Sequence, residues 1–141
     1  MEAKGEYRMK QKVIHTSGIR KTAVARATLK PGKGVIRING LLLDHYSTEL
    51  RRLKIREALL LAGDVVKKVD IKVNVKGGGP NAQAEAIRLA IARALAEYDS
   101  KLKDIYLEYD RQLLVADTRR KEQRKPLHHG KARAKKQTSY R

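Results

Sequence analysis

Apolar and polar residues alternate strictly over one short stretch, and this is the clearest structural signal in the chain. Val69, Ile71, Val73 and Val75 are each followed by a polar residue. A period of two is typical of a strand with one buried face. Residues 20–29 mix small, β-branched and cationic side chains with a looser alternation. We therefore predict a second strand there, and a sheet with one face that displays cations.

Turn-forming residues divide the first forty positions. Ser17-Gly18 predicts a turn after a strand that ends near residues 13–15. Pro31-Gly32-Lys33-Gly34 predicts a hairpin turn between the preceding strand and a short return strand at residues 35–38. Asn39-Gly40 predicts a further tight turn.

Apolar residues three and four positions apart predict helices in the rest of the chain. Residues 41–62 form one such segment, in one or two pieces, and Gly63 ends it. Residues 82–98 predict an alanine-rich helix, and residues 100–109 a shorter one. The order of elements predicts a two-layer α+β domain, with a mostly antiparallel four-stranded sheet and helices on one face.

Composition narrows the classes of protein that fit. The chain has 141 residues, which is room for one domain, and it contains no Cys, Phe or Trp, so we expect an aliphatic core without disulfides or thiolate zinc sites. There is no apolar run of about 18 residues, so we expect a cytosolic protein without a membrane span. His128-His129 has no neighbouring Cys or paired carboxylate, and we predict neither a metal nor a cofactor.

Charge is concentrated at the ends of the chain. The formal net charge is +18, and residues 118–141 hold ten Lys or Arg against the single acid Glu122. We predict a flexible basic N-terminus at 1–12, a globular RNA-binding domain at 13–117 and an extended basic tail at 118–141. The tail has almost no apolar side chains to bury, so alone it should be disordered and should become ordered on a polyanion.

The glycines at 77–79 precede a helix and suggest a phosphate-binding loop. The Walker and Rossmann spacings are both absent, however, so a tight strand-to-helix turn fits better. No pairing of a nucleophile with a base is evident. Two alternatives to RNA binding stay open: a small-molecule kinase-like enzyme that uses Gly77 to Gly79, and a general basic DNA-binding protein.

Three ordered motifs carry a resemblance to a known family. They are the run 17–26 with its continuation through 31–34 to 38–40, the run 77–95 with its three glycines and Ala-rich helix, and the tail with its entry at 117–119 and its end at 137–141. In these residues the chain resembles the S-nine family of small-subunit ribosomal proteins, and its Ser-Tyr-Arg ending resembles the archaeal type.

The resemblance implies a structural constituent of the small-subunit head, which is not an enzyme and has no small-molecule substrate. It implies a cytoplasmic, ribosome-bound protein whose partners are small-subunit rRNA, neighbouring head proteins and the peptidyl-site tRNA. It further implies that the tail tip reaches the anticodon stem-loop of that tRNA. It also implies the fold of the second domain of ribosomal protein S-five. We expect Tyr140 and Arg141 to contact tRNA. The residues expected to bind rRNA are Arg20, Lys21, Arg26, Lys33, Arg119, Arg120, Lys121, Arg124, Lys125, Lys131, Arg133, Lys135 and Lys136.

Overall fold

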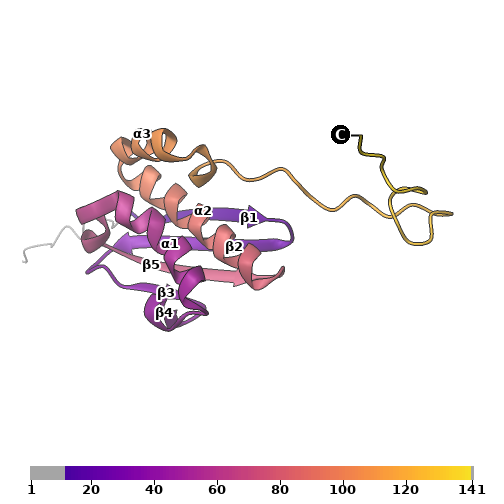
Figure 1. The fold of residues 1–141 in the computed structure, drawn as a ribbon. Coiled ribbons are helices and arrows are strands. Elements are labelled where there is room, and N and C mark those ends of the chain that lie inside the picture. Colours follow the sequence, from indigo (N-terminus) through magenta and orange to yellow (C-terminus); the bar gives the residue numbers. More distant parts are fainter. Residues whose placement is uncertain (1–11, 141) are drawn as a thin grey trace, which may run out of the picture.

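A five-stranded mixed sheet with helices on one face forms the body of the protein in the computed structural model (Figure 1). The structure describes residues 12–140, so the expectations for residues 1–11 and for Arg141 lie outside it. The strands are β1 (Ile14–Arg20), β2 (Ala23–Pro31), β3 (Ile36–Ile38), β4 (Leu41–Leu42) and β5 (Val69–Lys76). The helices are α1 (Glu49–Ala62), α2 (Pro80–Tyr98) and α3 (Ser100–Tyr109), with 3-10 turns η1 (Leu43–His45), η2 (Gly63–Lys68) and η3 (Arg111–Leu113).

The α+β class and the mostly antiparallel sheet are confirmed, but the predicted four strands are wrong. The strand order is β1-β2-β5-β3-β4, and β3 runs parallel to β5 while the other three pairings are antiparallel. The missed strand is β4, because its two leucines match a helical spacing as well as they match a strand. The likeness to the second domain of S-five stays a prediction.

The turn predicted at Ser17-Gly18 is also wrong. Strand β1 runs straight through both residues, and the chain reverses at Lys21, which has a φ of 53°. Gly18 has a packing role instead, since a Cβ built on it would lie 2.2 Å from the carbonyl oxygen of Ala86 in α2. The glycine therefore allows the backbones of β1 and α2 to approach closely.

Residues 31–34 do not form the predicted hairpin between β2 and β3. They cross the start of β5 instead, where Gly32 N donates to Lys68 O at 2.9 Å and Gly34 N donates to Val69 O at 3.1 Å. Strand β5 consequently lies between β2 and β3, which places the strictly alternating strand at the centre of the sheet.

The predicted helices are present, with adjusted bounds. The segment expected to be helical from residue 41 contains β4, η1 and α1, and Gly63 ends α1 with a positive φ of 58°. Pro80 occupies the first turn of α2, where its missing N–H costs nothing. Asp99 caps α3 by accepting a hydrogen bond from Lys101 N.

The core lies between the sheet and the helices, and its buried apolar side chains are aliphatic, as predicted, apart from Tyr46 and Tyr106. Alternate residues of β2 and β5 are buried, and α2 buries nine residues, five of them alanines at positions 84, 86, 90, 92 and 94. Small side chains let the helix lie close to the sheet. Tyr106 of α3 is fully buried, and its hydroxyl donates to Ala58 O at 2.7 Å, which ties α3 to α1.

Helix α1 turns polar side chains toward α2 and leucines toward solvent. Lys54 and Glu57 form ion pairs with Glu85 and Arg88 of α2, at 3.3 and 2.8 Å. The exposed large apolar residues of α1 are Leu50, Leu53 and Leu60. The outward face of α1 is therefore unusually apolar for a surface helix.

Candidate nucleic-acid interface

The sheet face opposite the helices is cationic. The residues that alternate with the buried ones in β2, β3 and β5 point to this face and are exposed or half-buried. Five of them carry positive charge: Arg26, Lys30, Arg37, Lys72 and Lys76. We call them the sheet-face cations. None of the five forms an ion pair within the described part of the chain, residues 12–140.

Strand register brings like charges together on this face. Arg37 of β3 is the register partner of Lys72 in β5, and Lys72 is in turn opposite Thr28. Like charges on directly opposed residues destabilise a sheet. A polyanion that binds over this row would relieve that repulsion.

Among the residues of β2, β3 and β5 that point to this face, the one acid is already engaged. Asp70 Oδ1 accepts hydrogen bonds from the backbone N–H groups of Val35, at 2.9 Å, and Lys33, at 2.8 Å. These bonds hold the pKa of the Asp70 carboxyl below its ordinary value. The carboxylate shapes the crossing of residues 31–34 and forms no ion pair with a sheet-face cation in the described structure.

Four cations expected to bind rRNA converge where the tail leaves the body. One hollow is lined by Lys21 and Thr22 of the β1–β2 turn together with three successive tail residues. These tail residues are Arg119, Arg120 and Lys121. The structure thus joins candidates that lie about a hundred positions apart in the sequence, and we call this group the tail-exit cluster.

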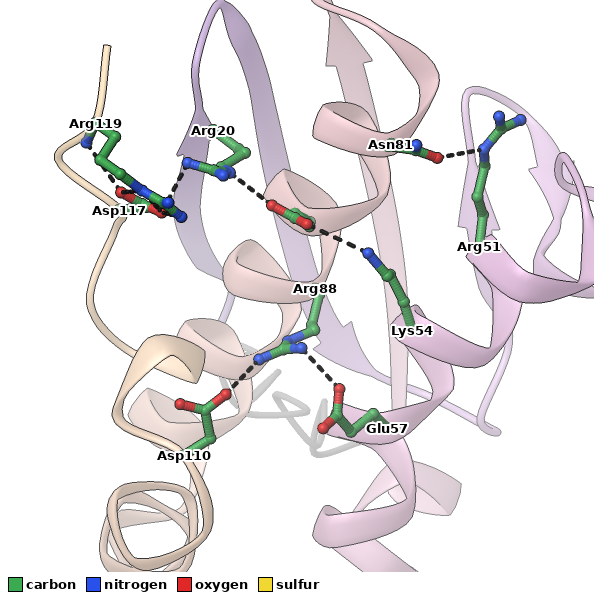
Figure 2. Close-up of polar contacts among 10 residues, drawn as sticks. Arg20, Arg51, Lys54, Glu57, Asn81, Arg88, Asp110, Asp117 and Arg119 are labelled. Atoms are coloured by element: carbon green, nitrogen blue, oxygen red, sulfur yellow. Dashed lines mark hydrogen bonds and ion pairs between the residues drawn. The ribbon is translucent and has the colours of Figure 1, made fainter. Parts of the chain in front are cut away.

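Arg20 lies on the helix side of the sheet, away from Arg26. Its Nε donates to Glu85 Oε2 at 2.6 Å, and its Nη1 lies 2.8 Å from Asp117 Oδ2, an ion pair without hydrogen-bond geometry. Its side chain is 16% exposed. Figure 2 shows the guanidinium reaching toward Asp117, so this cation binds the protein's own carboxylates.

The tail contains no helix or strand between residues 114 and 140 and extends away from the body (Figure 1). Two of its cations are paired: Arg119 with Asp117 at 2.7 Å, and Arg133 with Glu122 at 2.7 Å. The other predicted cations of the described tail are exposed and form no ion pair there: Arg120, Lys121, Arg124, Lys125, Lys131, Lys135 and Lys136. Tyr140 is 92% exposed.

Sequence reasoning missed four of the five sheet-face cations. Lys72 and Lys76 occupy polar positions of the strictly alternating strand, so its period alone places them on the face away from the core. The placement of Lys30 and Arg37 beside Lys72 and Lys76 could not be predicted without the strand order, because it depends on β2 and β3 both adjoining β5. Of the residues that were predicted for the body, Arg26 lies on this face, and Lys33 is exposed beside it.

The glycine loop has a packing explanation. A Cβ on Gly77 would lie 2.7 Å from Thr22 O, and one on Gly78 would lie 2.8 Å from the Cβ of Ala23. Both glycines also have positive φ, at 76° and 67°. The loop needs glycine to pass the start of β2, and a bound phosphate is not required to account for it.

Residues 12–140 contain no cluster of three or more His, Asp or Glu side chains with the geometry to hold a metal ion. They also contain no helix whose length and apolar character would let it traverse a bilayer.

In comparisons with known proteins, a family model and several individual relatives match this chain and agree with one another. The family described as ribosomal protein S9/S16 matches residues 18–141. Three similar proteins are each called "Small ribosomal subunit protein uS9". The one from Methanothrix thermoacetophila is 49% identical over 132 residues, covering 92% of this chain and 99% of the relative. Those from Pyrobaculum aerophilum and Thermoplasma volcanium are 48% and 51% identical, covering 92% and 91% of this chain and 92% and 98% of the relatives. The resemblance seen in the sequence is therefore confirmed, and this chain belongs to the ribosomal protein S9/S16 family.

Proposed function

We propose that this chain is a structural component of the small ribosomal subunit, without catalytic activity, that binds ribosomal RNA through its sheet-face cations and its tail. Its relatives carry the name of a small-subunit ribosomal protein. The observation that carries the proposal is the sheet face itself, where exposed cations lie beside one another without acidic partners in the described structure. Neighbouring proteins of the subunit head complete the proposed set of partners.

The proposed interface positions the protein on RNA by charge and shape. Lys and Arg side chains neutralise phosphates and release counterions, and this gives affinity without reading sequence. A sheet face with exposed, alternating cations fits a folded RNA surface, and the tail supplies a flexible cationic segment that takes its shape from the RNA. Selectivity then follows from the shape of the folded RNA.

The sheet face is tested by removing two of its charges. Each neutralised phosphate contributes about 0.9 to the slope of log affinity against log salt, so the double variant Lys72→Gln, Lys76→Gln should flatten that slope by roughly 1 to 2 on transcribed small-subunit rRNA. The matched control is Lys101→Gln, Lys103→Gln, which removes two exposed charges from α3. Equal slopes for the two double variants would refute the sheet face as an interface.

We also propose that the tail tip contacts the peptidyl-site tRNA through Tyr140 and Arg141. The support is the exposure of the Tyr140 ring, which is free to stack on a base. Deleting residues 139–141 should leave the protein in assembled small subunits while tRNA binds their peptidyl site more weakly. Tyr140→Ala should produce part of that loss, since stacking on an aromatic ring is worth about 1 to 3 kcal/mol per base. Unchanged tRNA affinity in both variants would remove this role.

A general DNA-binding role is the remaining alternative, and competition separates it from the proposal. Duplex DNA at equal phosphate concentration should displace small-subunit rRNA poorly if folded RNA is the partner. Comparable displacement by duplex DNA and by unlabelled rRNA would favour the alternative.

A further inference from the structure

The start of the tail is fastened to the body at two points. Arg93 of α2 donates from Nε to Leu114 O at 2.9 Å and from Nη1 to Ser17 O of β1 at 2.8 Å. Three residues later, Asp117 meets Arg20 at the end of β1. Leu113, just before these contacts, is fully buried and belongs to the core.

Asp117 uses both carboxylate oxygens in this second fastening. Oδ1 accepts the backbone N–H of Arg119 at 2.9 Å. Oδ2 lies 2.7 Å from Arg119 Nη2 and 2.8 Å from Arg20 Nη1. The Asp117 side chain is only 11% exposed, and Arg20 is held from its other side by Glu85, so the acceptor sits in a fixed environment (Figure 2).

Beyond this point the described tail has no polar bond to the body. Between residues 120 and 140, the hydrogen bonds of the tail join tail residues to one another, such as Lys125 N to Lys131 O and Arg133 to Glu122. Asp117 therefore makes the last polar contact with the body before the cationic segment begins. The tail-exit cluster follows immediately.

We propose that Asp117 is a positioning residue: by binding Arg20 and Arg119 together it fixes the direction in which the tail leaves the body and holds the tail-exit cluster in place for RNA. This inference rests on the proposed function, since it names the device that presents the tail to rRNA. Fixing the tail's origin reduces the entropy lost when the tail binds.

Simple electrostatics predicts the opposite effect on RNA affinity when the charge of Asp117 is removed. Asp117 is an acid beside a cationic RNA-binding segment, and it neutralises Arg119. If charge alone mattered, removing the acid would free a cation and tighten RNA binding. Under the positioning role, removing it weakens RNA binding although the net charge becomes more positive.

The variant Asp117→Asn tests this, with Asp64→Asn as the matched control. Both substitutions raise the net charge by one, and Asp64 is an exposed residue of η2 whose ion-pair partner is its neighbour Lys67. At constant salt, Asp117→Asn should bind small-subunit rRNA about 3- to 10-fold more weakly than the parent, as expected for the loss of one or two preorganised contacts. Asp64→Asn should bind equally or more tightly. Tighter or unchanged binding by Asp117→Asn overturns the proposal.

A second measurement examines the free protein and does not depend on RNA. The chain has no Cys, so nitroxide labels at Lys103→Cys on α3 and Gln123→Cys in the tail report one body-to-tail distance distribution. Asp117→Asn should broaden this distribution, whereas Asp64→Asn should leave it unchanged. Equal widths in all three proteins overturn the positioning role. If the parent fails to bind rRNA, the proposed function falls while the distance measurement still decides the role of Asp117.

Discussion

Gly18 is a position where adding a single methyl group should destabilise the protein strongly. A Cβ there would lie 2.2 Å from Ala86 O and 2.7 Å from Ala90 N, both of them backbone atoms of α2. Neither atom can move alone, because each belongs to a helix with many contacts to the sheet. Gly18→Ala must therefore push β1 away from α2. That movement strains the hydrogen bond from Thr16 Oγ1 to Ala90 O, which is 2.8 Å long.

The expected change in the free energy of unfolding of Gly18→Ala follows from two opposing contributions. Adding a methyl group to a close-packed contact typically costs about 1 to 3 kcal/mol, and replacing a strand glycine returns roughly 0.5 to 1 kcal/mol of backbone entropy. A net loss of roughly 1 to 2 kcal/mol corresponds to a fall in Tm of about 5 to 15 °C for a domain of this size.

Thermal unfolding followed by circular dichroism measures the effect, and Gly79→Ala is the matched control. Gly79 has an ordinary φ of −86° and no atom within 4 Å of its built Cβ. Its substitution should lower Tm by less than Gly18→Ala does, because nothing has to move and the cost is limited to a weaker N-cap of α2. Equal Tm values for the two variants would refute the argument that the β1 and α2 backbones touch at Gly18.

Tyr106 supports two further predictions. Tyr106→Phe should lower the free energy of unfolding by about 0.5 to 1.5 kcal/mol in urea titrations, because the bond to Ala58 O is lost and that carbonyl stays buried; an unchanged midpoint would contradict the buried bond. Burial also raises the pKa of the Tyr106 hydroxyl far above its ordinary value. Above about pH 10 the unfolded chain therefore loses this proton while the folded chain keeps it, so stability should fall with rising pH by up to about 1.4 kcal/mol per pH unit. The difference between parent and Tyr106→Phe should shrink over that range, and a constant difference would exclude the contribution of this hydroxyl.

The sequence was most informative where a pattern has a single physical cause. Strict alternation from Val69 to Val75 belongs to a strand with one buried face, and that strand is present as β5. The alanine-rich helix and the shorter helix after it were likewise predicted from local signals. These features depend on neighbours in sequence, which is why they could be predicted.

Errors arose where distant segments decide the local structure. Gly18 was interpreted as a turn residue, but α2, about seventy positions away, requires glycine there. Residues 31–34 were interpreted as a hairpin turn between β2 and β3, but their hydrogen bonds to residues 68 and 69 carry the chain across β5. Local composition contains no information about either contact.

The residues of the candidate site likewise include some that could be predicted from local sequence and others that could not. Tail cations follow from composition alone, because a segment without apolar side chains leaves its charges exposed. Arg20 has the same composition signal as Arg26, but a carboxylate from α2 and one from the tail entry hold it within the protein. Distinguishing an exposed, unpaired cation from one that is held by carboxylates requires the tertiary structure.

The outward leucines of α1 bear on how the protein exists before it is assembled. The charge of +18 keeps free chains apart and attracts any available polyanion. A polyanion that neutralises this charge removes the repulsion and leaves Leu50, Leu53 and Leu60 exposed to neighbouring chains. Storage of the unassembled protein at high concentration would therefore favour aggregates and misplaced complexes. A low concentration of the free protein, which is incorporated into complexes as quickly as it is synthesised, suits this surface better than a large stock of unassembled protein.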